Sequence, residues 1–236
     1  MAVAFDIQSE SHTGTTGSAS EASFTWSHNP TGVPRGVLVF TFVNANADNA
    51  TGVTYDSVAL TALAGARAVN TGTEPGDVKA WFLGASVPTT DPANVVVTRT
   101  NNANVMYAVA ITLTGAANLE MKGTPVLVTT IGTLAETNVD SGADTAIRFA
   151  GLNSGLAAVP TIGGNSSAHN PTGSIDFGSR IISTCRETTP GSGSRPVGWS
   201  DAGSDDRAVV YLAIGEVAVA MSLLPTRTPY ENLRTR

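Results

Sequence analysis

Several features common in other protein classes are scarce or missing in this chain. It has a single cysteine, Cys185, so no disulfide can form within it and a disulfide-stapled scaffold is excluded. Charged residues make up 14% and aromatic residues 6%, and the charged share lies well below the ~25% usual for soluble domains. The longest apolar run, at 209–224, is short for a membrane span and is interrupted by Glu216. No membrane partner is therefore expected, and the first ten residues lack the pattern of a signal peptide.

The charge distribution also argues against nucleic-acid binding. Lys79 and Lys122 are the only lysines beside eleven scattered arginines, and the formal net charge is −6. No basic stripe appears, as a phosphate backbone would require. Solubility must come from Thr, Ser, Asn and Gly, a composition suited to a surface packed against partners, although high-GC codon usage could also produce it.

Motifs for catalysis or cofactor binding are not found. No serine stands in a Gly-X-Ser-X-Gly context, and no strand carries the alternating pair of acids typical of glycoside hydrolases. Acids cluster in expected turns instead, including Glu74 with Asp77, and Asp201 with Asp205 and Asp206. The last cluster could offer oxygens to Ca²⁺, but an ordinary acidic turn explains it as well. We therefore predict no enzyme activity, no cofactor and no metal ion, and a core thiol for Cys185.

Short strand signals fill the chain. The run Gly36–Val43 is β-branched and aromatic without a break and is bracketed by turn formers, which indicates a buried strand; similar runs follow at 105–114 and 209–219. Signals recur roughly every ten to fifteen residues, and no long window shows helical spacing. The sequence predicts an all-β protein with ten or more short strands, forming a jelly-roll-like β-sandwich. Two tandem immunoglobulin-like domains would need a linker, and none is apparent, so a single domain over 1–217 is predicted.

Local patterns make more detailed predictions. A hairpin is expected to turn at Asp56-Ser57, and the alternation of SFTWS at 23–27 places Phe24 and Trp26 on the inner face. Residues 160–173 read as a loop. The motif HNPTG occurs at 28–32 and again at 169–173, which indicates two similar turns, while an ion site shared by the two histidines would need them close in space.

The C-terminal arm, residues 218–236, differs from the body. It contains two prolines and carries a net charge of +2, which leaves −8 on the rest of the chain. Such a segment has little means of folding alone, so we expect it to lie on its own body or on another chain. Extended arms can add to a neighbour's sheet edge while large side chains fill pockets. The predicted partner-binding residues are Arg227, Tyr230, Leu233, Arg234 and Arg236.

Several stretches together resemble a family of poorly characterised proteins encoded by tailed bacteriophages. They are SFTWSH at 23–28, GVPRGVLVF at 32–40, GVTY at 52–55, EPG at 74–76 and WFLG at 81–84. The resemblance extends over roughly residues 20–115, and less firmly over 148–156 and 195–217. It implies a virion structural protein, either a head decoration or cement protein or a tail component.

These observations lead to one main hypothesis and two alternatives. The main hypothesis is a non-enzymatic capsid decoration protein, located in the virion, that contacts the major capsid protein or other virion proteins and forms a homo-oligomer. The first alternative is a carbohydrate-binding module for host attachment, for which Trp199, between Gly198 and Ser200, would be the exposed stacking residue. The second is a hydrolytic enzyme acting through Glu74 or Asp205.

Overall fold

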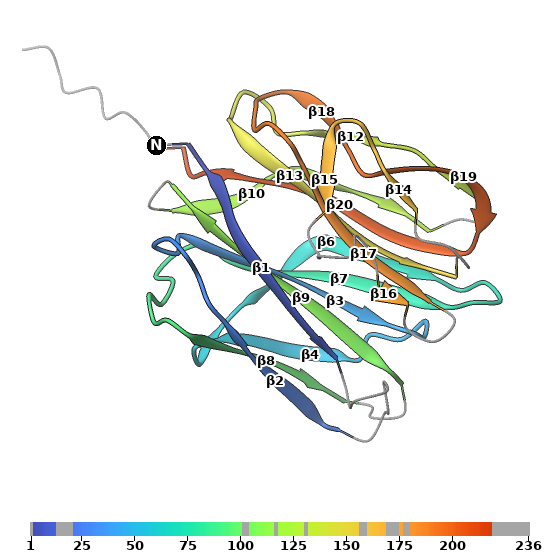
Figure 1. Cartoon of the computed structure of the whole chain (residues 1–236), viewed down its shortest axis with the longest axis horizontal. Coiled ribbons are helices and arrows are strands. Elements are labelled where there is room, and N and C mark those ends of the chain that lie inside the picture. Colours follow the sequence, from blue (N-terminus) through green and yellow to red (C-terminus); the bar gives the residue numbers. More distant parts are fainter. Residues whose placement is uncertain are drawn as a thin grey trace, which may run out of the picture.

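The computed structural model describes residues 2–12, 21–100, 104–115, 118–129, 132–155, 160–168, 175–176 and 180–218. These residues form β-strands joined by turns and loops, with no helix among them, which confirms the all-β prediction (Figure 1). Consequently, the described part of the chain contains no helix long and apolar enough to cross a membrane.

Residues 2–115, here called the first module, form two antiparallel sheets. The first inner sheet has the order β1 (Ala4–His12), β9 (Met106–Thr114), β3 (Gly36–Val43), β7 (Gly76–Leu83) and β6 (Thr61–Asn70). The first outer sheet has the order β2 (Ser23–His28), β8 (Ala93–Arg99), β4 (Ala50–Tyr55) and β5 (Val58–Ala59). The pairs β1–β9, β2–β8, β3–β7 and β4–β5 are nested in the sequence. This nesting is the topology of a jelly roll.

Residues 118–218, the second module, repeat this order. The second inner sheet runs β10 (Leu119–Val128), β20 (Arg207–Glu216), β13 (Ala146–Ser154), β17 (Ile181–Glu187) and β15 (Ser166–Ala168), and β16 (Ile175–Asp176) also pairs with β17. The second outer layer has β11 (Gly132–Leu134), β19 (Trp199–Asp205) and β14 (Thr161–Ile162) in one sheet, and β12 (Thr137–Asp140) with β18 (Ser194–Val197) in another. Strand for strand, β10, β20, β13 and β17 take the places of β1, β9, β3 and β7.

The two modules pack through their inner sheets. Phe40 and Phe42 of β3 and Phe149 of β13 belong to one central core that includes residues of both modules. β3 packs on its equivalent β13, β6 packs on β10 and β20, and β7 packs on β20 and β13. At the opposite side of the interface the Arg186 guanidinium of β17 lies 4.5 Å from the ring centroid of Phe5 in β1. The inner sheets therefore face each other in reversed strand order, as expected of two like modules related by an approximate two-fold axis.

Each inner sheet also has a second buried face. Val39 and Trp81 contact the core of the first module, and Ala150 and Tyr211 contact that of the second. Burial on both faces explains why Gly36–Val43 is apolar without alternation. The described residues thus form a stack of four layers (Figure 1). Three hydrophobic cores lie between these layers.

The sequence-based predictions can now be compared with this structure. A jelly-roll-like sandwich is confirmed, but the span 1–217 contains two sandwich modules where the sequence suggests one. Because the two modules share a core, the single domain over this span stays a prediction, which unfolding experiments can test. The hairpin turn at Asp56 and Ser57 is confirmed, with φ of 46° and 68°, and so is the burial of Phe24. The prediction of a loop at 160–173 is wrong in part, because β14 and β15 lie within this range.

Candidate functional site

One end of the molecule gathers both ends of the described chain, and we call it the junction end. The β9–β10 connection lies there too: the Val217 amide donates to the Asn118 carbonyl at 3.1 Å, and the Leu119 amide donates to the Gly84 carbonyl at 2.9 Å. In Figure 1 the start of β1, marked N, lies beside the chain leaving β20. Ala2 and Ala218 accordingly line the same pocket.

Two pockets open at the junction end. Pocket 1 has a volume of about 320 Å³ and is lined by Ala2, by residues 143–145 of the β12–β13 loop, and by residues 216–218 at the end of β20 and just beyond it. Pocket 2 has a volume of about 460 Å³ and is lined by the start of β1, the β2–β3 loop and the end of β9. Because β13 and β20 are equivalent to β3 and β9, and each pocket is lined by the loop before the former and by the end of the latter, the two pockets occupy like positions in the two modules. Ala2 contributes to both.

The electrostatics of the two pockets differ. At pocket 1 the Lys122 ammonium group, whose side chain is only 7% exposed, lies 2.8 Å from the Asp144 carboxylate and 2.7 Å from that of Glu120. Burial alone would lower the pKa of Lys122, but these two carboxylates outweigh it and raise the pKa. Of the acidic residues here, Asp144 and Glu216 line the pocket itself. The Lys122 ammonium group thus faces two carboxylates, so this cluster beside pocket 1 is net negative.

Pocket 2 is closer to neutral, because it contains both Asp6 and Arg35. The carboxylate of Asp6 accepts hydrogen bonds from the Thr31 amide at 3.0 Å, from the Gly32 amide at 3.1 Å and from the Thr31 hydroxyl. Asp6 therefore holds the β2–β3 loop in place, and much of its hydrogen-bonding capacity is used within the module.

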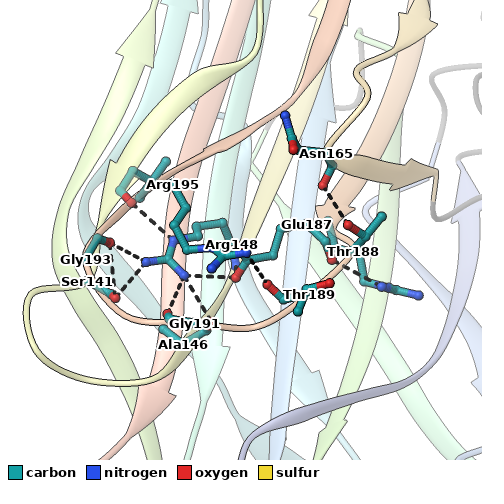
Figure 2. Close-up of polar contacts among 12 residues, drawn as sticks. Ser141, Ala146, Arg148, Asn165, Glu187, Thr188, Thr189, Gly191, Gly193 and Arg195 are labelled. Atoms are coloured by element: carbon teal, nitrogen blue, oxygen red, sulfur yellow. Dashed lines mark hydrogen bonds and ion pairs between the residues drawn. The ribbon is translucent and has the colours of Figure 1, made fainter.

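A buried arginine network fixes the loop that lines pocket 1 (Figure 2). The fully buried guanidinium of Arg148 donates to the Ser141 hydroxyl at 2.7 Å and to the Gly191 carbonyl at 2.6 Å, and pairs with the Glu187 carboxylate at 2.9 Å. The Ser141 hydroxyl in turn donates to the Asp144 carbonyl at 2.8 Å. A buried guanidinium with this many partners orients its neighbours strongly, so the position of Asp144 is set from inside the module.

A serine–histidine pair also occurs, inside the first module. The Ser9 hydroxyl lies 2.6 Å from Nδ1 of His28 and accepts a hydrogen bond from the Trp26 indole at 2.8 Å; Nε2 of His28 faces the Thr112 hydroxyl. Burial lowers the pKa of His28 to about 4, although the charge of Asp6 acts in the opposite direction. Because His28 has no exposed surface, a substrate has no access to it, and the group serves to tie β1, β2 and β9 together.

Part of the acidic clusters expected from the sequence lies at the contact between the modules, where Asp206 of the second module meets Glu74 of the first. Residues 201–205 belong to β19, so the prediction of an acidic turn there is wrong apart from Asp206. The Asp206 carboxylate accepts hydrogen bonds from the Glu74 amide at 2.9 Å and the Thr73 hydroxyl at 3.0 Å. Arg180 lies 3.6 Å from the Glu74 carboxylate. Within the described residues no three His, Cys, Asp or Glu side chains are arranged to hold a metal ion.

The tryptophans do not form an exposed platform. Trp199, expected to be exposed, is fully buried, and its indole donates to the Ser183 hydroxyl at 3.0 Å. The prediction of its exposure is wrong because Trp199 begins β19 and points into the core of the second module. Trp81 is also buried. Cys185 is a fully buried thiol, as predicted, and burial raises its pKa.

Other predicted residues lie outside the part of the chain that the structure describes. These are His169 of the repeated motif and the arm residues Arg227, Tyr230, Leu233, Arg234 and Arg236. Conversely, little in the sequence pointed to pocket 1. The interruption of an apolar run by Glu216 and the turn acids at 140–144 were the available signals, but no motif joins two loops so far apart in the sequence.

No family model, curated protein or solved structure matches the chain.

Proposed function

We propose that the protein is a non-enzymatic structural component of a tailed-phage particle, bound to the capsid exterior as a decoration or cement protein. The observation that carries this proposal is the junction end, where both ends of the described chain and two equivalent pockets meet on a rigid body. A body with three packed cores suits a load-bearing role. The resemblance of residues 20–115 to phage-encoded proteins supports the virion setting.

The partners proposed are the major capsid protein or other virion proteins, together with further copies of this chain. The arm, with Arg227, Tyr230, Leu233, Arg234 and Arg236, leaves the body at the junction end, because Ala218 lines pocket 1. A cationic, proline-containing segment of this kind suits binding to an acidic or grooved surface of a neighbour. The carbohydrate-binding alternative loses its candidate residue, since Trp199 is buried.

Deletion of residues 222–236 tests the proposal. Particles assembled with the truncated chain should carry far fewer copies than particles assembled with the full chain, measured by quantitative gel analysis of purified virions. The truncation leaves the three cores intact, because all of their residues precede the deletion. Unchanged occupancy would remove the proposed role of the arm, and absence of the full-length protein from purified particles would remove the virion role itself.

A further inference from the structure

We propose that pocket 1 is the docking site for residues 222–236 of the C-terminal arm of a second copy of this chain. The proposal rests on the proposed function in one respect, namely that the arm is a partner-binding segment. It adds the receiving site and the identity of the partner.

Charge complementarity is the first argument. The carboxylates of Asp144 and Glu216 line pocket 1. The Glu120 carboxylate lies nearby, because it pairs with the same Lys122 ammonium group as Asp144 does. The side chain of Asp144 is 44% exposed, so it can accept a hydrogen bond from an incoming group while keeping its ion pair with Lys122. The arm offers three arginines against one glutamate. Arginine suits such a site because its guanidinium can bind a carboxylate through two parallel hydrogen bonds.

The size and walls of the pocket are the second argument. A volume of about 320 Å³ admits one or two side chains, not a folded element. The methyl groups of Ala2, Ala143 and Ala218 and the side chain of Val217 supply apolar walls beside the carboxylates. Tyr230 and Leu233 are large apolar residues that stand between Arg227 and Arg234 of the arm. One of them would fill the pocket while a neighbouring arginine reaches Asp144 or Glu216.

Pocket 2 is a poorer receptor for the same segment, despite its equivalent position. Arg35 is part of its lining and repels an incoming arginine, and the carboxylate of Asp6 is held by Thr31 and Gly32. The approximate two-fold relation between the modules thus produces two pockets, of which only the one in the second module has the charge that the arm requires.

The geometry of the chain favours a second copy over the parent chain. Ala218 lines pocket 1, so the arm starts at the site itself. Tyr230 is twelve residues further on, a span of roughly 40 Å for a proline-containing extended chain at ~3.1 Å per residue. To bind its own pocket the arm would have to turn back fully, and Pro225 and Pro229 each favour extended backbone at and before their positions. An arm that instead continues away from its own body would reach a neighbouring copy of the chain.

Two full-length variants test the receiving site. Asp144→Asn with Glu216→Gln removes the negative charge of the pocket while keeping side-chain size, and Tyr230→Ser with Leu233→Ser removes the proposed anchors. Glu21→Gln is the matched control, because it deletes one carboxylate before the start of β2, at the end of that strand away from the pockets. Light scattering should show an oligomer for the parent and the control, and a shift to monomer at the same concentration for both double variants.

A fluorescent peptide of residues 222–236 gives a second measurement on the same proteins. It should bind the Tyr230→Ser, Leu233→Ser protein, whose pocket is intact and empty, at least tenfold more tightly than the same protein carrying Asp144→Asn and Glu216→Gln. Equal binding, or a pocket variant that remains oligomeric, would overturn the docking site. A monomeric parent whose pocket binds the peptide only after its own anchors are removed would show docking within one chain and overturn the second-copy assignment.

Particle incorporation separates this inference from the proposed function. If the pocket variant remains an oligomer and still joins particles, the docking site is wrong while the virion role stands. If the parent self-associates through pocket 1 but never joins particles, the virion role is wrong while the docking site stands.

Discussion

His28 shows how a single buried residue couples this fold to pH. Its two ring nitrogens face the hydroxyls of Ser9 and Thr112, and the edge of its ring meets Tyr55 at a centroid distance of 6.1 Å. The Trp26 indole already donates to the Ser9 hydroxyl, so the proton of that hydroxyl is directed at Nδ1. The neutral ring therefore fits the site. In the charged ring Nδ1 carries a proton and can no longer accept the hydrogen bond from Ser9, and the charge stays buried.

The stability of the protein should fall with acid in a way that depends on His28. The pKa of His28 is about 4 in the folded chain, against 6.5 ordinarily, because burial disfavours the charged ring. Below pH 6.5 the unfolded chain binds more protons, so the contribution of His28 is complete above pH 6.5 and is lost as the pH falls towards 4. The loss should be about 3 kcal/mol over that window.

Urea unfolding at pH 7 and pH 4 measures this effect. Carboxylates also titrate in this range, so the parent is compared with His28→Gln, which retains polarity but has no ring to protonate. The parent should lose about 3 kcal/mol more of its free energy of unfolding than the variant does between the two pH values. An equal loss in both proteins would show that His28 is not the group responsible.

At the scale of elements, long strands were more predictable than short ones. Gly36–Val43 and Arg207–Glu216 are eight and ten residues long and almost wholly buried, so continuous apolar runs reveal them. β14 has two residues and β11 has three, too few for any periodicity to appear. The sequence therefore carries little periodic signal for the second outer layer. This is why it predicts one sandwich where the structure has two modules.

The strand that starts the second module is anchored on the first module at Gly84. A Cβ atom at Gly84 would lie 1.9 Å from the Leu119 carbonyl oxygen, which is backbone and cannot move aside cheaply. Gly84→Ala should therefore displace the start of β10 and lower the free energy of unfolding by about 1–3 kcal/mol, as overpacked sites do. Chemical denaturation with tryptophan fluorescence would measure the change.

Gly132→Ala is the control for this substitution, because a Cβ atom there meets nothing within 4 Å. It should change stability by no more than about 0.5 kcal/mol. Similar losses for Gly84→Ala and Gly132→Ala would mean that the close approach of β10 to Gly84 does not constrain the module junction.

For the whole molecule, the question is whether two modules behave as one body. The hydrogen bonds between them are specific: the Asn153 side chain of β13 donates to the Val43 carbonyl at 2.9 Å, and Asp206 holds the turn at Glu74. The sequence could not show these pairings, because they join residues 110 and 132 positions apart. Together with the central core they make separation of the modules costly, since it would expose apolar surface and leave buried polar groups without partners.

Phe40 is the residue that tests this coupling most directly. Its ring packs on the backbone of Gly151, and a Cβ atom added to Gly151 would lie 2.8 Å from that ring. The first and second modules therefore touch here without a side chain of Gly151 between them. Phe40→Ala would leave a cavity in the central core and should lower the free energy of unfolding by about 3–5 kcal/mol. If residues 1–217 form one cooperative domain, calorimetry should show a single transition for the parent and a single transition at lower temperature for the variant. Two transitions in the parent, of which Phe40→Ala shifts only the one belonging to the first module, would instead make the modules separate domains that merely lie against each other.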